Sequence, residues 1–292
     1  MTPAVSVTRG DHTTFLKWHR ARRFGTDPVF TGRRIVEGMA AGASVEVDLV
    51  IHGDHGFAVL HDLSLDHDTT GHGLVRETPA AVLRGLHLRG ADGAPIPDTV
   101  MLLDDLAALI QQQGAHPDAV LQLDYKQDAA ALTPAAIATF VLALRPVAGH
   151  FILSSGDAAA VTLLADPVPG LRIGHDPCHD GALERLQDTL DFTGFVAGAV
   201  AASPKAEMIY LDHRLVLTAA KLGFDLIAAF HVADRRVDAY TIQTADAAGL
   251  AAATRLLDLK ADQITTDDPE GLALALAQFF QGASRNCSIS QA

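Results

Sequence analysis

The chain has 292 residues, of which 49% are hydrophobic and 20% charged, so it can build one large α/β domain or two ordinary ones around a sizeable core. That balance excludes global disorder. The net charge of −13 argues against a broad surface for nucleic acid or for an anionic membrane, although a small anionic substrate needs only a local cluster of positive charge.

The sequence shows no sign of secretion or of membrane insertion. Its two cysteines, Cys178 and Cys287, are far apart, which favours free thiols in a reducing compartment over a disulfide. The N-terminal stretch lacks the basic and apolar regions of a secretory signal, and no clean run of about 18 apolar residues could span a bilayer. We therefore expect a cytoplasmic protein with no stable insertion into a membrane and no nucleic-acid partner.

The first predicted strand ends in two residues that carry chemistry. Residues 14–18 are mostly apolar and form a short strand that delivers His19 and Arg20 at its C-terminal end. A basic loop and a helix over 33–41 follow, with its apolar residues on one side.

A second strand, over 45–51, alternates apolar and acidic residues and then becomes purely apolar. Side chains two apart on a strand point to the same side, so Glu46 and Asp48 project together. A Gly-containing turn leads into a second apolar run, 57–60, which ends at His61. Two acids and a histidine on neighbouring strand ends indicate a hydrolytic site with a hard metal; the alternative is an exposed edge strand with surface acids.

Beyond His61, residues 63–97 are irregular and too long for a simple connection, so we expect a small functional insertion there. Strands and helices then alternate to the end of the chain. Eight alternations without a compositional boundary indicate a single-domain α/β fold over 1–292, a (β/α)8 TIM barrel with an insertion after the second strand and a polar tail over 281–292. The later predicted elements are a helix over 100–113, a strand over 119–126, a helix over 133–144, a strand over 150–154, a helix over 157–164, a strand over 171–175, a helix over 181–190, a weak Ala-rich element over 196–202, a strand over 208–211, a long helix over 216–232, a strand over 237–242, a helix over 245–257, a strand over 263–267 and a helix over 269–280.

Three carboxylates from two strands, Glu46, Asp48 and Asp124, are predicted to converge at the mouth of this barrel. Ligation by oxygen alone favours one hard divalent cation, Mg²⁺ or Ca²⁺. The alternative for Asp124 is an ion pair with Lys126, because residues two apart on a strand share a face.

Fixed positive charge and two imidazoles would complete such a site. Arg20 and Lys126 lie beside the predicted metal, and in so acidic a chain a bound phosphate explains the pair best, although either alone is often a structural ion-pair member. His19 and His61 each end an apolar run on the carboxylate side, and imidazole titrates near the operating pH of general acids and bases.

The order and spacing of several short motifs resemble the glycerophosphodiester phosphodiesterase family, within the phosphatidylinositol phospholipase C-like phosphodiesterase superfamily. The resemblance covers residues 18–277 and implies a (β/α)8 barrel with an insertion after the second strand. The motifs are His19-Arg20, the ExD of Glu46-Val47-Asp48, the HD of His61-Asp62, the TTGxG of 69–73, the Ile-Pro of 96–97 and the ITTDDP of 264–269.

The resemblance also implies roles for the candidate residues. The two histidines, His19 and His61, would be the acid–base pair, and Arg20 and Lys126 would hold the phosphate. The acids at 46, 48 and 124 would bind the divalent metal.

The chain shows three departures from the family pattern. Ala21 replaces the glycine of HRG, and Val29 stands where the glutamate of PEN is expected. The third acid is Asp124 in place of Glu, and Tyr240 replaces the tryptophan of a Trp-Thr-Val-Asn stretch. An aspartate with a lysine two residues on is similar to the related sphingomyelinase D-type phospholipases. Tyr240 is a candidate to line the pocket for the alcohol, or else a plain barrel-core aromatic.

These observations lead to one functional hypothesis and its rivals. We expect metal-dependent hydrolysis of glycerophosphodiesters, small phosphodiester substrates, to glycerol 3-phosphate and an alcohol, with His61 favoured as base and His19 as acid. A lysophospholipase D-like or sugar-phosphodiester hydrolase would use the same site, and a non-catalytic barrel would only bind a phosphorylated ligand. The sequence leaves the oligomeric state and the choice of cation open.

Overall fold

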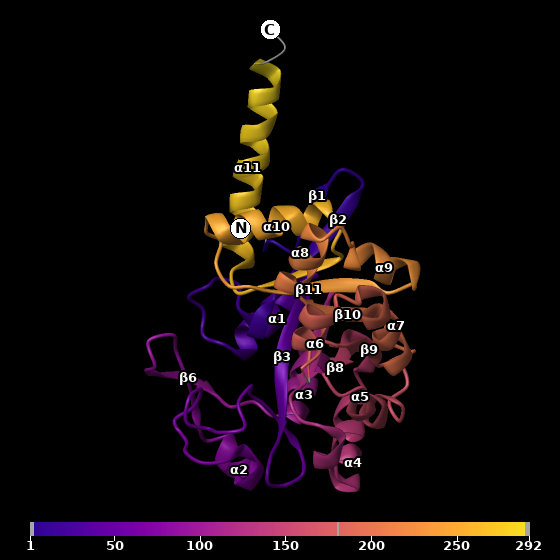
Figure 1. The fold of residues 1–292 in the computed structure, drawn as a ribbon. Helices are drawn as coiled ribbons and strands as arrows, with labels where there is room; N and C mark the ends of the chain where they lie inside the picture. The colour runs from indigo at the N-terminus through magenta and orange to yellow at the C-terminus, as the bar shows by residue number, and fades with distance from the viewer. Residues whose placement is uncertain (1–2, 180, 290–292) are drawn as a thin grey trace.

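The structure is a computed structural model that describes residues 3–179 and 181–289 (Figure 1). Eight parallel strands form a sheet that closes on itself, because the first barrel strand pairs with the second through Trp18 and Val45. Helices surround this sheet, so the predicted (β/α)8 barrel is confirmed (Figure 1).

The barrel strands follow the predicted apolar runs closely. In order around the barrel they are β2 (His12–Trp18), β3 (Ser44–Ile51), β7 (Val120–Tyr125), β8 (Phe151–Ser154), β9 (Arg172–His175), β10 (Met208–Asp212), β11 (Arg236–Ile242) and β12 (Gln263–Thr266). Two further strands extend the sheet by antiparallel pairing, β1 (Ser6–Arg9) on β2 and β4 (Phe57–Val59) on β3.

The helices begin where the sequence supplies capping side chains. Asp157, Asp225 and Asp246 each accept hydrogen bonds from the free N–H groups of the helix that follows them. The helices are α1 (Gly32–Ala41), α2 (Ala80–Leu83), α3 (Leu103–Gln113), α4 (Pro134–Leu144), α5 (Ala158–Ala165), α6 (Ala182–Thr189), α7 (Phe192–Ala202), α8 (His213–Lys221), α9 (Leu226–Val232), α10 (Ala247–Asp258) and α11 (Pro269–Ile289).

The core lies between the strands and the ring of helices. One cluster of buried apolar side chains joins β3, β7 and β8 to the helices α1, α3, α4 and α5, and a second joins β10, β11 and β12 to the helices α8 to α11. This apolar layer leaves the barrel interior for polar groups, which build the site described below.

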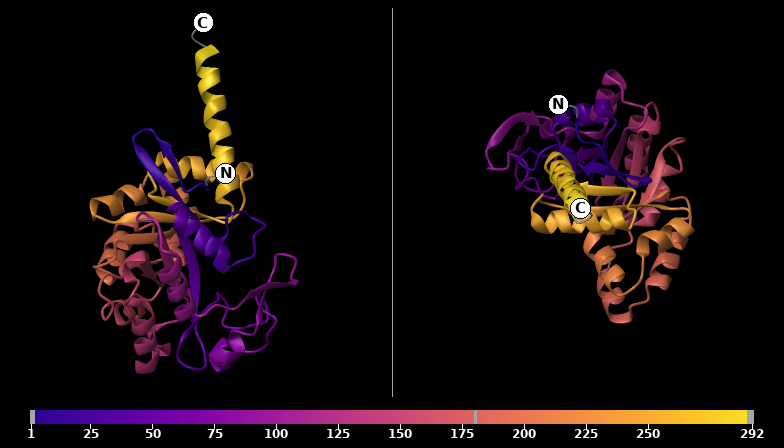
Figure 2. Two further views of the ribbon diagram at one scale, coloured as in Figure 1. Left: turned by 180° about the vertical axis from the view of Figure 1, so that it is seen from behind. Right: turned by 90° about the horizontal axis from the view of Figure 1, so that it is seen from above.

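The insertion forms a small subdomain beside the C-terminal end of β3 (Figures 1 and 2). It contains α2 and a two-stranded antiparallel sheet of β5 (His87–Arg89) and β6 (Pro95–Thr99). Buried side chains such as Leu65, Val75 and Leu88 join it to the first core cluster, which fixes it to the barrel mouth.

Two helical predictions need correction. The single helix expected over 216–232 is two helices, because the chain turns at Gly223, whose φ of +86° is a left-handed conformation that glycine adopts easily. The last helix does not end at Phe280 but continues to Ile289 as α11, which extends away from the barrel on the side opposite the insertion (Figures 1 and 2).

Within the described residues no single helix is long and apolar enough to cross a membrane. The pair α8 and α9 reaches that length only jointly, across a bend of 100°.

Gly38 lets α1 pack closely on the sheet. A Cβ at this position would lie 2.6 Å from Val45 Cγ2 and 3.2 Å from the Trp18 ring, and both of these side chains are fully buried. We expect Gly38→Ala to lower the free energy of unfolding by about 1–3 kcal/mol, because an overpacked core must shift. Urea denaturation measures this change.

The matched control is Gly198→Ala in α7, where an added Cβ would meet no other atom within 4 Å. There the substitution should raise the free energy of unfolding by about 0.5–1 kcal/mol, because alanine favours the helix over glycine. Changes of the same sign at the two positions would contradict the packing argument.

Candidate active site

One cavity of about 280 Å³ lies at the C-terminal ends of the barrel strands. The parallel register aligns Asp48 of β3 with Asp124 of β7, so the two carboxylates lie side by side. Asp48 is fully buried behind the cavity wall. The other candidate residues line the cavity itself: His19, Arg20, Glu46, His61, Asp124, Lys126 and Tyr240.

The three predicted metal ligands form one cluster. Glu46, Asp48 and Asp124 each offer an oxygen within 4.8 Å of the others, and Glu46 and Asp48 are buried. Nζ of Lys126 lies 2.7 Å from Asp48 and Nε of Arg20 lies 3.2 Å from it, but neither contact has hydrogen-bond geometry, so both Asp48 oxygens lack a hydrogen bond among the described residues. Buried carboxylate oxygens without hydrogen bonds fit a hard divalent cation.

The electrostatics of the cluster differ from one carboxylate to the next. Burial, followed by repulsion from Glu46, raises the pKa of Asp48 to about 7. Burial also opposes ionisation of Asp124, but attraction and a hydrogen bond from Lys126 outweigh it, and the pKa of Asp124 is lowered. The cluster therefore holds more negative charge than its own cations neutralise, which again favours an added cation.

Arg20 and Lys126 are engaged with these acids. Lys126 donates to Oδ2 of Asp124 at 2.5 Å, so the ion pair weighed as an alternative for Asp124 is present together with the carboxylate cluster. The backbone N–H of Arg20 donates to Glu46 at 2.7 Å. Burial disfavours the charge of Lys126, but the neighbouring carboxylates outweigh this effect and raise its pKa. Lys126 therefore stays a cation.

Each candidate histidine is held by an aspartate through Nδ1. In His19 that nitrogen lies 2.5 Å from Asp267, which also pairs with Arg22, and in His61 it lies 2.7 Å from Asp62. This leaves Nε2 of each ring for the cavity. Burial lowers the pKa of His19 although Asp267 opposes the shift, which favours the neutral imidazole.

A polar network below the carboxylates was not predicted. Buried Lys17 pairs with Asp238 at 2.9 Å and donates to Oε1 of Gln122, and Nε2 of Gln122 donates to Ser154 at 2.8 Å. Since Ser154 accepts that bond, its hydroxyl proton is directed to Asp124 at 2.6 Å. The network thus orients one metal-ligand candidate, and its signal in the sequence was a polar residue inside each apolar strand.

A further wall of the cavity carries residues absent from the predicted site. Asp176 and His179 follow β9 and line the cavity with Tyr240, so Tyr240 lies at the cavity, where a pocket-lining residue is expected. Sequence reasoning missed His179 because it lies in a loop, where no periodic pattern marks the direction of a side chain.

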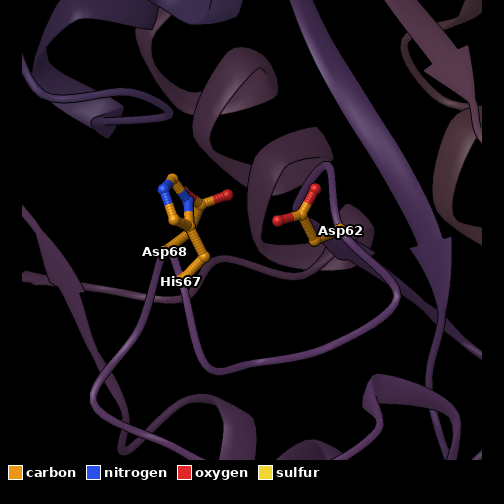
Figure 3. A group of neighbouring side chains, drawn as sticks. All are labelled: Asp62, His67 and Asp68. Carbon is orange, nitrogen blue, oxygen red and sulfur yellow. The ribbon is translucent and has the colours of Figure 1, made fainter.

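A second group of metal-ligand types lies in and next to the insertion (Figure 3). Asp62, His67 and Asp68 offer atoms within 4.8 Å of one another, and Nδ1 of His67 lies 2.7 Å from Asp68. His67 is 82% exposed, and Figure 3 shows the Asp62 carboxylate set apart from the other two. The buried cluster at Asp48 is therefore the stronger candidate for a metal centre.

The sequence over residues 35–271 matches the profile of the glycerophosphoryl diester phosphodiesterase family. This chain belongs to that family. The predicted resemblance is confirmed, and family membership makes the chain a phosphoric diester hydrolase. His19 and Arg20 precede the matched residues, so their place at the site comes from the structure.

Several solved structures share this fold. A Silicibacter pomeroyi DSS-3 protein assigned to the glycerophosphoryl diester phosphodiesterases is 20% identical, with a TM-score of 0.72 over 92% of this chain and 95% of that chain. An Oleispira antarctica phosphodiesterase, solved with the product sn-glycerol-3-phosphate, is 21% identical, with a TM-score of 0.62 over 90% and 96%. A glycerophosphodiester phosphodiesterase of Agrobacterium tumefaciens is 19% identical, with a TM-score of 0.64 over 89% and 99%. A search of curated protein sequences found no significant match.

Two departures from the family motifs have visible structural consequences in this phosphodiesterase. Ala21, which replaces a glycine, has a φ of +58°, a conformation that glycine would adopt at lower cost. Val29, which replaces a glutamate, packs against the first core cluster and does not line the cavity. The substitution at Val29 therefore removes a charge without removing any residue of the described site.

Proposed function

We propose that this family member hydrolyses glycerophosphodiesters to glycerol 3-phosphate and an alcohol, with one divalent cation, Mg²⁺ or Ca²⁺, and with His19 and His61 as the acid–base pair. One observation carries the proposal. A buried carboxylate cluster, two cationic side chains and two imidazoles converge on one cavity, and an aspartate fixes each imidazole. Phosphodiester hydrolysis needs all three kinds of group: a cation site, positive charge at the phosphoryl oxygens and proton transfer at two oxygens.

The cation would be held by Glu46, Asp48 and Asp124, whose oxygens lie together and include the two Asp48 atoms without hydrogen bonds. When bound, it would supply Lewis-acid stabilisation of charge at the phosphoryl group. Binding would also neutralise the negative charge that now engages Arg20 and Lys126. Their N–H groups would then be available for the phosphoryl oxygens.

The two histidines would divide the proton transfers. We propose His19 as the base that deprotonates the glycerol hydroxyl that attacks phosphorus, because burial favours its neutral ring, and Asp267 would stabilise the imidazolium that forms. His61, next to Asp62 and more exposed, would protonate the departing alkoxide, which leaves a cyclic phosphate. Water, deprotonated by His61, would then open the ring to glycerol 3-phosphate, and His19 would return its proton to the glycerol oxygen. This assignment reverses the one favoured from the sequence.

The test is release of glycerol 3-phosphate from glycerophosphoethanolamine and glycerophosphoglycerol in the presence of Mg²⁺, Ca²⁺ or EDTA. We expect turnover that requires a divalent cation and stops in EDTA. Binding of the substrates without turnover under every condition would reject the proposal and support a non-catalytic barrel. Turnover that persists unchanged in EDTA would reject the metal dependence.

A further inference from the structure

A third histidine–carboxylate pair lines the same cavity from the loop after β9. The carboxylate cluster and both candidate catalytic histidines come from β2, β3 and β7 and the segments after them. In the closed sheet β9 is four strands from β2 in either direction, and the loop after β9 carries Asp176 and His179. β9 is only two strands from β7, so this loop forms a further wall of the cavity, next to Asp124 and Lys126.

His179 is held in place although it lies in a loop. Its Nε2 lies 3.0 Å from Oδ2 of Asp176, a buried carboxylate that also accepts from the N–H of Cys178 at 2.8 Å. Behind the ring, a Cβ on Gly156 would lie only 2.6 Å from Cγ and Cδ2 of His179. The imidazole is thus fixed by a carboxylate and by close packing against glycine.

The position of His179 matches the path of the leaving alcohol. In phosphoryl transfer the attacking and leaving oxygens lie roughly in line on opposite sides of phosphorus. His19 and His61 would serve these two oxygens, and an alcohol released at His61 extends into the rest of the cavity, which His179 lines. His179 also borders a second cavity of about 570 Å³ next to α5, α6 and α7, so there is room beyond it for an alcohol larger than ethanolamine.

Nδ1 of His179 could distinguish between alcohols by hydrogen bonding. Asp176 engages Nε2, which leaves Nδ1 as an acceptor in the neutral ring or a donor in the charged ring. A hydroxyl group can complement either form, whereas a trimethylammonium group can complement neither. The hydrogen bond that His179 donates to Asp176 also raises the pKa of His179, and a charged imidazole repels a cationic headgroup.

We propose that His179 is a specificity-determining residue, which hydrogen-bonds a hydroxyl of the departing alcohol and favours polyhydroxylated alcohols of the glycerol or inositol type over choline. The inference rests on the proposed function, because it concerns the substrate of the same site. Asp176 and Gly156 act through His179 as the groups that fix its wall of the cavity.

The experiment compares kcat/KM for glycerophosphoinositol and glycerophosphocholine in the wild type and in His179→Leu. We expect the wild type to prefer the inositol substrate and the variant to lower that preference about tenfold, the equivalent of one lost hydrogen bond. His179→Gln, whose amide can still donate and accept, should recover part of the preference. Gly156→Ala, which displaces the ring without changing it, should also lower the preference.

The controls separate specificity from folding and from the activity itself. His72→Leu changes a histidine in the insertion that is 80% exposed, and it should keep the wild-type preference. The inference is overturned if the preference changes by less than about twofold in both His179→Leu and Gly156→Ala. It is also overturned if these variants lose activity equally with both substrates. Either outcome leaves the proposed function intact. Absence of wild-type turnover with every glycerophosphodiester would overturn the proposed function, and the inference with it.

Discussion

His19→Ala is expected to lower kcat/KM for glycerophosphodiesters by about 10²–10⁴-fold, the usual contribution of a positioned general acid or base. His61→Ala should give a loss in the same range. The fold should survive the first substitution, because Arg22 continues to pair with Asp267 after the imidazole is gone. Steady-state release of glycerol 3-phosphate measures the effect, with far-UV circular dichroism to confirm folding.

A substrate with an activated leaving group distinguishes the two histidines. Glycerophospho-p-nitrophenol releases an anion that needs little help from an acid, so it should restore much of the rate of His61→Ala but not that of His19→Ala. Rescue of His19→Ala instead would restore the assignment favoured from the sequence. His72→Ala is the control, and a loss of less than about threefold in both active-site variants would show that neither histidine transfers a proton.

Asp48→Asn is expected to lower the affinity for Mg²⁺ or Ca²⁺ by at least about 100-fold, since even partners outside the ligand set typically contribute 10–100-fold. Asp48 is the most buried of the three acids, and both of its oxygens lack hydrogen bonds. Calorimetric titration of the EDTA-treated protein measures the affinity without reference to activity. Asp68→Asn, in the group drawn in Figure 3, is the matched control and should bind like the wild type.

The same substitution should stabilise the metal-free protein at pH 8. The pKa of Asp48 is about 7 in the folded chain against an ordinary value of 3.8, so the folded state binds more protons between these values. The contribution of Asp48 to the free energy of unfolding is therefore fully present below pH 3.8. It is lost as the pH rises through 7, and the loss is on the order of a few kcal/mol. Asp48→Asn removes this dependence, and urea denaturation at pH 5 and pH 8 measures it. A lower free energy of unfolding for Asp48→Asn than for the wild type at pH 8 would contradict this prediction.

Most of the barrel could be predicted because its strands are short apolar runs with marked ends. The run 45–51 became β3 with Glu46 and Asp48 on one side, since the two-residue period of a strand is a local property. The long helix predicted over 216–232 was wrong because its apolar pattern continues across Gly223, where the chain bends by 100° between two helices. Periodicity reports which residues are buried and does not report a bend between two helices that both pack against the core.

The sequence identified residues of the site where they end a strand. It did not identify their hydrogen-bonding partners where a distant element supplies them. His19 and His61 could be selected, but the pairing of His19 with Asp267 joins positions 248 residues apart that meet only because β12 lies beside β2. Arg20 and Lys126 were expected at a phosphate, and the structure shows them against Asp48, because the nearest negative charge in the folded chain is the carboxylate cluster.

The sequence by itself determined the alternation of strands and helices, the acids that share a strand face and the residues at strand ends, because these depend on local spacing. Only the tertiary structure decided the partners of those residues. Closing the barrel placed Lys17 against Asp238 and Gln122, and it brought His179 into the same cavity as His19 and Asp124. The reason is physical: a buried charge needs a partner within a few ångströms, and in a closed barrel that partner comes from a strand far away in the chain.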